Sequence, residues 1–266
     1  MEKQNKFVKD MTKGNPMQLL IQFSLPLLVG NIFQQLYNMV DSIIVGNFVG
    51  ANALGAIGTT NSLNFFFFSL VAGLSVGIGI IVAQYFGFGD EEKVKDAIGN
   101  SIWIITVCSV IMAIIGFVTA RPILVLLDTD PVILNDAVAY LKVVSIGIVC
   151  VGFYNGVSGI LRALGDSKTP LIFLIVASVL NVILDLIFVL SFGWGVVGAG
   201  VATAFSQLIS ALACIIYAYK SNTYFKLKKK NIKLNGNIIK KSCKLGIPVA
   251  LQNSLIAFSY KCQQHF

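Results

Sequence analysis

Long apolar runs separated by short polar segments dominate the chain, and this pattern predicts membrane-spanning helices. A helix needs about 20 apolar residues to cross the hydrocarbon core of a bilayer. Six runs are long enough, roughly 17–45, 56–83, 98–120, 138–160, 170–192 and 196–219. A seventh begins near Leu245, and after Tyr260 the sequence becomes too polar to complete a span. The expected fold is an all-α, polytopic membrane helix bundle with six transmembrane helices and a truncated seventh.

The first apolar run carries its polar residues on one helical face. They recur at three- and four-residue steps, with two more at the flanks: Asn31, Gln34, Asn38 and Asp41, then Gln35 and Ser42. Pro26 removes a backbone hydrogen bond inside the same run, which predicts a bend there. A carboxylate at membrane depth costs several kcal/mol unless it faces a cavity or a partner, so Asp41 is a candidate functional residue. The alternative is a purely structural role as a cap or in an ion pair.

A second membrane aspartate, Asp185, follows Asn181 by four residues in the fifth run, and the sixth run contains Thr203. At 1.5 Å per residue, Asp41 and Asp185 each lie ~13 Å from the outer end of their spans, and Thr203 ~10 Å from its own. These four residues can therefore meet in the outer half of the membrane if spans one, five and six are neighbours. Such polar stripes also serve as contacts between helices, which is the competing interpretation.

Composition and charge support a membrane protein. The chain of 266 residues is 56% hydrophobic and 12% charged, with a mean hydropathy of +0.81, whereas soluble domains carry about 25% charged residues. The net charge of +8 could suggest nucleic acid as a partner. However, 17 of the 20 basic residues gather on alternate connections, which is a topology pattern. It predicts a multi-pass cell-membrane protein with a cytoplasmic N-terminus, an outer 121–136 loop and no nucleic-acid partner.

The remaining reactive residues indicate neither a metal centre nor an enzyme. The five cysteines lie in or beside the apolar runs without C-x-x-C spacing, and the one histidine, His265, is the penultimate residue. Intramembrane aspartyl proteases also use two membrane aspartates, but in Tyr-Asp and Gly-x-Gly-Asp motifs. Here Asp41 follows Val40 and Asp185 follows Leu184. No cofactor is expected, and no cleavable signal peptide, because the first run is too long for one.

The seventh run restates the first. Residues 245–253 align with 24–31 so that Pro248 falls on Pro26 and Asn253 on Asn31. This repetition predicts a second six-span unit in the same orientation. The expected organisation is a cytoplasmic tail (1–16), a six-helix lobe (17–219), a cytoplasmic linker (220–244) and the truncated start of a second lobe (245–266).

Three motifs resemble the multidrug and toxic compound extrusion (MATE) family in its bacterial branch. They are QQLYNMVDSIIVG at 34–46, LRALGDSKTP at 161–170 and NVILD at 181–185, and the likeness extends over about 15–260. The resemblance implies two six-span lobes that export organic cations and drugs against inward H⁺ or Na⁺. It also implies that Asp41, Asn181, Asp185 and Thr203 form the ion site of the first lobe. Na⁺ could bind the same oxygens in place of H⁺. A second lobe or a second copy of the chain is the expected partner.

The resulting hypothesis is cation-coupled antiport. Two neighbouring carboxylates in a low dielectric cannot both be ionised cheaply, so they are suited to take up H⁺ or Na⁺. Uptake would bend the first span at Pro26 and shrink a cavity lined by Gln34, Asn38 and Asn155, releasing the organic cation outward. The alternatives are a lipid-linked oligosaccharide flippase, which would require basic residues inside the spans, and a non-transporting remnant.

Overall fold

The computed structural model describes residues 15–264, and within them it is helical with no strand. The α-helices are α1 (Pro16–Phe48), α2 (Ala51–Gly87), α3 (Glu91–Leu126), α4 (Pro131–Ala163), α5 (Lys168–Asp185), α6 (Gly195–Ser221) and α7 (Gly236–Gln264). A π-helical turn, η1 (Leu186–Ser191), continues α5, and a short 3-10 turn, η2 (Thr223–Phe225), follows α6. Six helices, α1–α4, α5 with η1, and α6, are long and apolar enough to cross a membrane. The all-α prediction and its six spans are confirmed.

Two predicted connections are shorter in the structure. Helices α3 and α4 extend through most of the predicted 121–136 loop and leave only residues 127–130 between them. Pro131 occupies the first turn of α4, and the Asp130 carboxylate accepts a hydrogen bond from the Val132 amide at 2.8 Å. At the other connection, α7 begins at Gly236 instead of near Leu245. In both places the helix extends beyond the predicted span through turns that contain charged or polar residues, so the length of the apolar run alone placed the helix ends wrongly.

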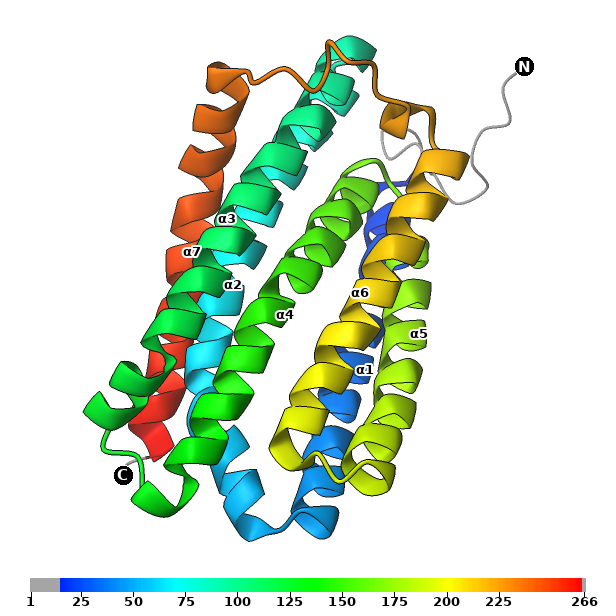
Figure 1. Cartoon of the computed structure of the whole chain (residues 1–266). Coiled ribbons are helices and arrows are strands. Elements are labelled where there is room, and N and C mark those ends of the chain that lie inside the picture. Colours follow the sequence, from blue (N-terminus) through cyan, green and yellow to red (C-terminus); the bar gives the residue numbers. More distant parts are fainter. Residues whose placement is uncertain (1–14, 265–266) are drawn as a thin grey trace.

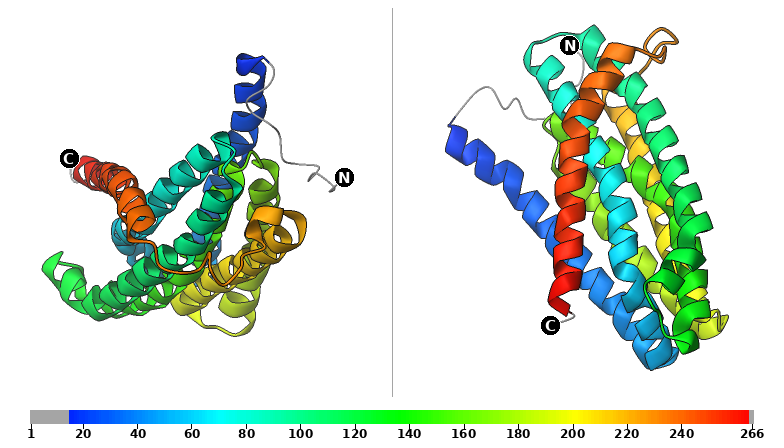
Figure 2. Two further views of the ribbon diagram at one scale, coloured as in Figure 1. Left: turned by 90° about the horizontal axis from the view of Figure 1, so that it is seen from above. Right: turned by 90° about the vertical axis from the view of Figure 1, so that its left-hand side faces the viewer.

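The helices run up and down between two ends of a bundle (Figure 1). Residues 87–91, 163–168 and 221–236 lie at one end, called the linker end, and residues 48–51, 126–131 and 185–195 lie at the opposite end. Helix α4 packs against α2, α3 and α6, whereas α1 packs mainly against α5. Figure 2 shows that α1 leans away from the other helices towards the linker end. This separation opens the bundle between α1 and α2.

Helix α7 packs closely on α2 through two glycines. A Cβ atom on Gly73 would lie 2.5 Å from the backbone of Ala250, and one on Gly77 would overlap the backbone of Ser242 and Gly246. The G-x-x-x-G spacing of these two glycines is typical of closely packed membrane helices. A 2.7 Å hydrogen bond between the hydroxyls of Ser69 and Ser254 also joins the two helices.

The start of α3 is set by Asp90. Its carboxylate accepts a hydrogen bond from the Lys93 amide at 3.1 Å, and the Lys93 ammonium lies 2.6 Å from the same carboxylate. The hydrogen bond to the Lys93 side chain, with that from its amide, lowers the pKa of Asp90. Asp90 therefore caps the helix in its ionised form.

The segment between α6 and α7 is held on α3 by paired asparagine and aspartate groups. The Asn231 amide donates to the Asp96 carboxylate at 2.7 Å, and the Asn100 carbonyl accepts from the Asn235 amide at 2.8 Å. Asn100 also donates to the Lys233 carbonyl at 3.3 Å. We call these residues, Asp96, Asn100, Asn231 and Asn235, the linker contact.

Two further features complete the attachment of this segment. The Trp103 indole donates to the Ile232 carbonyl at 2.9 Å, and Lys230 pairs with Glu92 at 2.6 Å on the surface. A Cβ atom on Gly99 would overlap the Asn231 carbonyl, so only glycine allows the linker to lie this close to α3.

Candidate functional site

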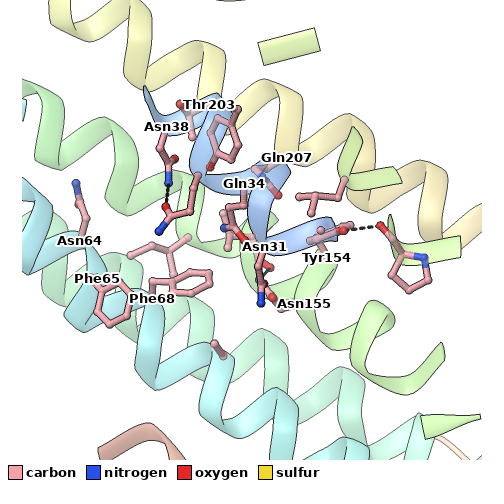
Figure 3. A pocket seen from close by; sticks show the side chains of 18 of the residues that line it. Asn31, Gln34, Asn38, Asn64, Phe65, Phe68, Tyr154, Asn155, Thr203 and Gln207 are labelled. Atoms are coloured by element: carbon pink, nitrogen blue, oxygen red, sulfur yellow. Dashed lines mark hydrogen bonds between the residues drawn. The ribbon is translucent and has the colours of Figure 1, made fainter. Parts of the chain in front are cut away.

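A cavity of about 1080 Å³ lies between α1, α2, α4, α5 and α6 (Figure 3). Eight of its lining residues are amides: Asn31, Gln34, Gln35, Asn38, Asn61, Asn64, Asn155 and Gln207. Two tyrosines and two phenylalanines add aromatic surface: Tyr37, Tyr154, Phe65 and Phe68. The cavity is therefore polar but mostly uncharged, with apolar patches.

The polar stripe on α1 faces this cavity. Gln34 and Asn38, both predicted to line it, do so, and Asn155 of α4 lines it from another side. The Asn38 amide lies 3.4 Å from the Gln35 side-chain oxygen. Pro26 lies within α1, which continues through it as one helix, and it borders the cavity as well. A bend at Pro26 stays a prediction.

The Phe65–Phe68 run divides between cavity and core. Phe65 and Phe68 line the cavity with their ring centroids 6.3 Å apart. Phe67 is buried in an apolar cluster with Val71 and Ile148. Because adjacent helical positions point in different directions, one run contributes to both.

The two membrane aspartates lie together behind the cavity wall, towards the opposite end. Asp41 of α1 is 9% exposed and Asp185, the last residue of α5, is fully buried. Their carboxyl groups are close enough to share a hydrogen bond when one is protonated. The π-helical turn η1 begins directly after Asp185, and such turns are frequent at functional sites.

Asn181 and Thr203 connect the aspartates to the cavity. The Asn181 amide, 1% exposed and one turn before Asp185, donates to the Thr203 hydroxyl at 3.4 Å. Thr203 also lines the cavity. The structure thus brings Asp41, Asn181, Asp185 and Thr203 to one place, because α5 packs against both α1 and α6.

Several oxygens of this group have no hydrogen-bond donor among the described residues. They are Asp41 Oδ1, Asn181 Oδ1 and both carboxyl oxygens of Asp185. A buried acceptor left without a donor costs about 1–3 kcal/mol, and native proteins keep few of them. The described residues contain no cluster of three or more His, Cys, Asp or Glu side chains. An all-oxygen set of two carboxyls, an amide and a hydroxyl fits a proton or a hard cation such as Na⁺.

Two tyrosines beside the aspartates were not found from the sequence. Tyr37 and Tyr140 both lie within electrostatic range of Asp41 and Asp185. Tyr37 stands one helical turn before Asp41, so the spacing of the stripe could have revealed it. Tyr140 comes from α4 and is buried in an apolar cluster with Val45, which no local pattern indicates.

The third motif, LRALGDSKTP, forms the turn from α4 into α5. The Asp166 carboxylate accepts hydrogen bonds from the Thr169 amide at 3.0 Å and the Thr169 hydroxyl at 2.6 Å. The Tyr154 hydroxyl donates to the Pro170 carbonyl at 2.9 Å. These bonds explain the residue types in the motif as helix-start chemistry.

Helix α4 continues past the end of the predicted 138–160 span. It ends at Ala163, and Arg162 in its last turn lines the cavity. Elsewhere, the four cysteines with described side chains are unpaired. His265 and nearly all of the predicted 1–16 tail lie outside the described residues.

Six membrane-length helices, five of which line a polar cavity with a buried acid pair behind its wall, define a polytopic membrane protein. The profile of the MatE family matches residues 26–187, and the chain belongs to this family. The chain is 34% identical over 248 residues to "Probable multidrug resistance protein YpnP" of Bacillus subtilis, covering 93% of this chain and 55% of that protein.

Solved structures agree with this assignment. A MOP superfamily transporter from Pyrococcus furiosus, described as having a binding pocket of reversed polarity, superimposes with a TM-score of 0.87 at 28% identity. A second structure, the outward-facing conformation of a multidrug resistance MATE family transporter, gives the same score and identity. Each comparison covers 95% of this chain and 56% of the other protein. The chain spans about half the length of the relatives it matches.

Proposed function

We propose that this chain is the first lobe of a multidrug efflux transporter that exports organic cations and drugs by H⁺- or Na⁺-coupled antiport. The observation that carries the proposal is the pair of buried carboxyl groups, Asp41 and Asp185, whose oxygens lack donors beside a large polar cavity. The names of relatives such as YpnP, a probable multidrug resistance protein, support drugs as the cargo.

The proposed coupling between the acid pair and the cavity uses Thr203, which accepts a hydrogen bond from Asn181 and lines the cavity. Asp41 and Asp185 together favour uptake of a proton or Na⁺, because two adjacent carboxylates in a low dielectric repel each other when both are ionised. In the ionised state they place negative charge behind the cavity wall and attract a cationic guest. Uptake of the coupling ion removes that charge, and a bend of α1 at Pro26 would narrow the space beside Gln34, Asn38 and Asn155.

The proposed orientation has the linker end facing the cytoplasm. Its support is the count of 17 of 20 basic residues on that side of the predicted topology. Single cysteines at Lys229 and Asp128, in a chain without native cysteines, test it. A membrane-impermeant maleimide should label position 229 only in broken cells and position 128 in intact ones. The reverse labelling would contradict the topology and the direction of transport.

The function is tested by dye efflux from membrane vesicles with an imposed pH or Na⁺ gradient. The chain is expressed alone and together with the second half of the Bacillus subtilis relative YpnP, because a second lobe or a second copy is the proposed partner. Gradient-driven expulsion of cationic dyes, with retention of anionic ones, is expected from the paired halves. Movement of a lipid-linked oligosaccharide instead would favour the flippase, and no movement of either would identify a non-transporting remnant.

A further inference from the structure

The cavity carries its charge at one end only. Among the described residues that line it, Arg162 is the one charged side chain, and none of them is acidic. Arg162 belongs to the last turn of α4 at the linker end, near Ser167 and Pro170 of the following turn. The acid pair lies at the other end of the cavity and behind its wall. The positive charge of Arg162 and the negative charge of the aspartates are therefore separated.

The guanidinium of Arg162 is not used by the fold. In the part of the chain that the structure describes, it forms neither an ion pair nor a hydrogen bond. Asp166, the acidic residue of the same turn, already accepts two hydrogen bonds from Thr169. Gly159, one turn earlier on α4, has no side chain, and a Cβ atom there would stand 4.0 Å from Arg162 Nη2. Arg162 therefore borders the cavity without a partner among the described residues.

An arginine in this position is suited to bind an oxyanion. Its five N–H donors form a planar fork that matches the two oxygens of a carboxylate. A partly buried cation without a partner is costly, and a ligand that brings a carboxylate removes this cost. Arg162 is thus the group at the linker end that a ligand can satisfy.

The cavity is long enough for a guest that carries a charged group at one end and an aromatic body beside it. Along α4, the lining residues from Val144 to Arg162 span ~27 Å. Between these ends the wall offers amides and the rings of Phe65 and Phe68, which suit a flat aromatic body. A purely cationic guest gains nothing at Arg162, whereas a guest that also carries a carboxylate is attracted there.

We propose that the linker end of the cavity is a subsite for the carboxylate of amphiphilic aromatic substrates, with Arg162 as its anchor. This inference rests on the proposed function, since it concerns the same cavity, and it predicts that compounds with an acidic group beside their cationic or aromatic part are preferred within that cargo. It also gives Arg162 a role in binding, because Arg162 lies on a helix that lines the cavity and not in a connecting loop.

A matched pair of dyes tests the subsite by binding alone. Tetramethylrhodamine carries a free carboxylate and a delocalised cation, and its methyl ester carries the same cation without the acid. Fluorescence anisotropy with the purified chain in phosphatidylcholine nanodiscs gives both dissociation constants. The acid should bind about tenfold more tightly than the ester, the ratio expected from one charge-assisted contact. Equal binding of both dyes by the unmodified chain would overturn the proposal.

Variants assign the preference to one residue. Arg162→Gln should bring the ratio to about one while the ester still binds, which also shows that the cavity is intact. Lys168→Gln is the matched control, because it removes a positive charge from an exposed residue at the same end that does not line the cavity. It should keep the tenfold ratio. A ratio that survives in Arg162→Gln, or is lost equally in Lys168→Gln, would refute the anchor.

The result also separates this inference from the proposed function. If neither dye binds, the cavity is not a drug site and the proposed function fails with it. If both bind with no preference for the acid, only the carboxylate subsite fails. In nanodiscs of phosphatidylglycerol, selective loss of the acid preference would assign Arg162 to lipid phosphate and overturn the cargo subsite.

Discussion

The linker contact and the acid group behind the cavity are built from the same residue types, yet their hydrogen bonding differs. In the linker contact, Asn231 donates to Asp96, and Asn100 both donates to and accepts from the linker backbone. Behind the cavity, Asp185 has no donor on either carboxyl oxygen within the described part of the chain. The linker contact satisfies its polar groups with other groups of the chain. The acid group leaves its oxygens available to an ion that comes from outside.

This difference indicates which cluster holds the protein together and which one acts. Satisfied polar pairs fix geometry, and removing one member leaves the other unpaired, so they are costly to break. Unsatisfied carboxyl groups already carry that cost in the folded state, and their removal should relieve it. Substitutions in the two places should therefore affect stability and transport in opposite ways.

The largest effect is expected from Asp41→Asn, which keeps size and hydrogen-bonding capacity but removes titration. Gradient-driven dye efflux by the paired halves should be lost completely, whereas insertion and thermal stability in detergent should be retained, because a membrane charge is removed. Asp185→Asn should behave in the same way, since the pair takes up ions as a unit. Full gradient-driven efflux by Asp41→Asn would make its carboxylate structural.

Asn100→Ala should reverse this pattern. It leaves the Lys233 carbonyl and the Asn235 amide without their partner, so the free energy of unfolding should fall by about 1–3 kcal/mol. The dependence of efflux on the ion gradient should be unchanged per folded molecule. Denaturant titration in detergent, with efflux normalised to folded protein, measures both. A loss of coupling at unchanged stability would show that the linker contact belongs to the transport machinery.

Thr203→Ala should weaken coupling without abolishing it, because a neutral hydroxyl is removed while both acids stay. We expect a several-fold reduction in the gradient dependence of efflux. Ser206→Ala is a suitable control, since the Ser206 hydroxyl donates only to the Thr203 carbonyl within its own helix. If both variants behave alike, the Thr203 hydroxyl is not a ligand of the ion site.

The smallest effect is expected from Lys230→Gln. Its surface pairing with Glu92 raises the pKa of Lys230 through a hydrogen bond and the nearby charge, but both side chains are more than half exposed. Exposed ion pairs contribute little and are screened by salt. The melting temperature should not change measurably. A clear drop would mean that the linker depends on this pair more than on its buried asparagines.

Much of the fold was predictable because hydropathy and helical spacing are local properties. The runs predicted six spans, and Gln34 and Asn38 of the polar stripe both line the cavity because three- and four-residue steps share a helical face. The adjacency of spans one, five and six was a condition of the site prediction, and the packing of α5 against α1 and α6 meets it.

Other features depended on contacts that sequence spacing does not contain. Tyr140 reaches the acid pair from α4 inside an otherwise apolar run, and the Asn231 pairing with Asp96 joins residues 135 positions apart. Arg162 lies just beyond the predicted 138–160 span, since an apolar run ends before a charged residue whether or not the helix does. A helix can continue past the apolar region when its last turn borders a cavity, so that its charge faces inward.

The bare strip that Gly73 and Gly77 leave on α2 has a consequence for biosynthesis. The residues that cover it, around Gly246, are made about 170 positions later in the chain, which at 5–20 residues per second is roughly 10–30 s of synthesis. During that interval α2 exposes its backbone surface to lipid or to any other helix with small residues. Arrival of α7 is thus a late assembly step, and conditions that slow translation between α6 and α7 lengthen the time in which α2 can pair wrongly.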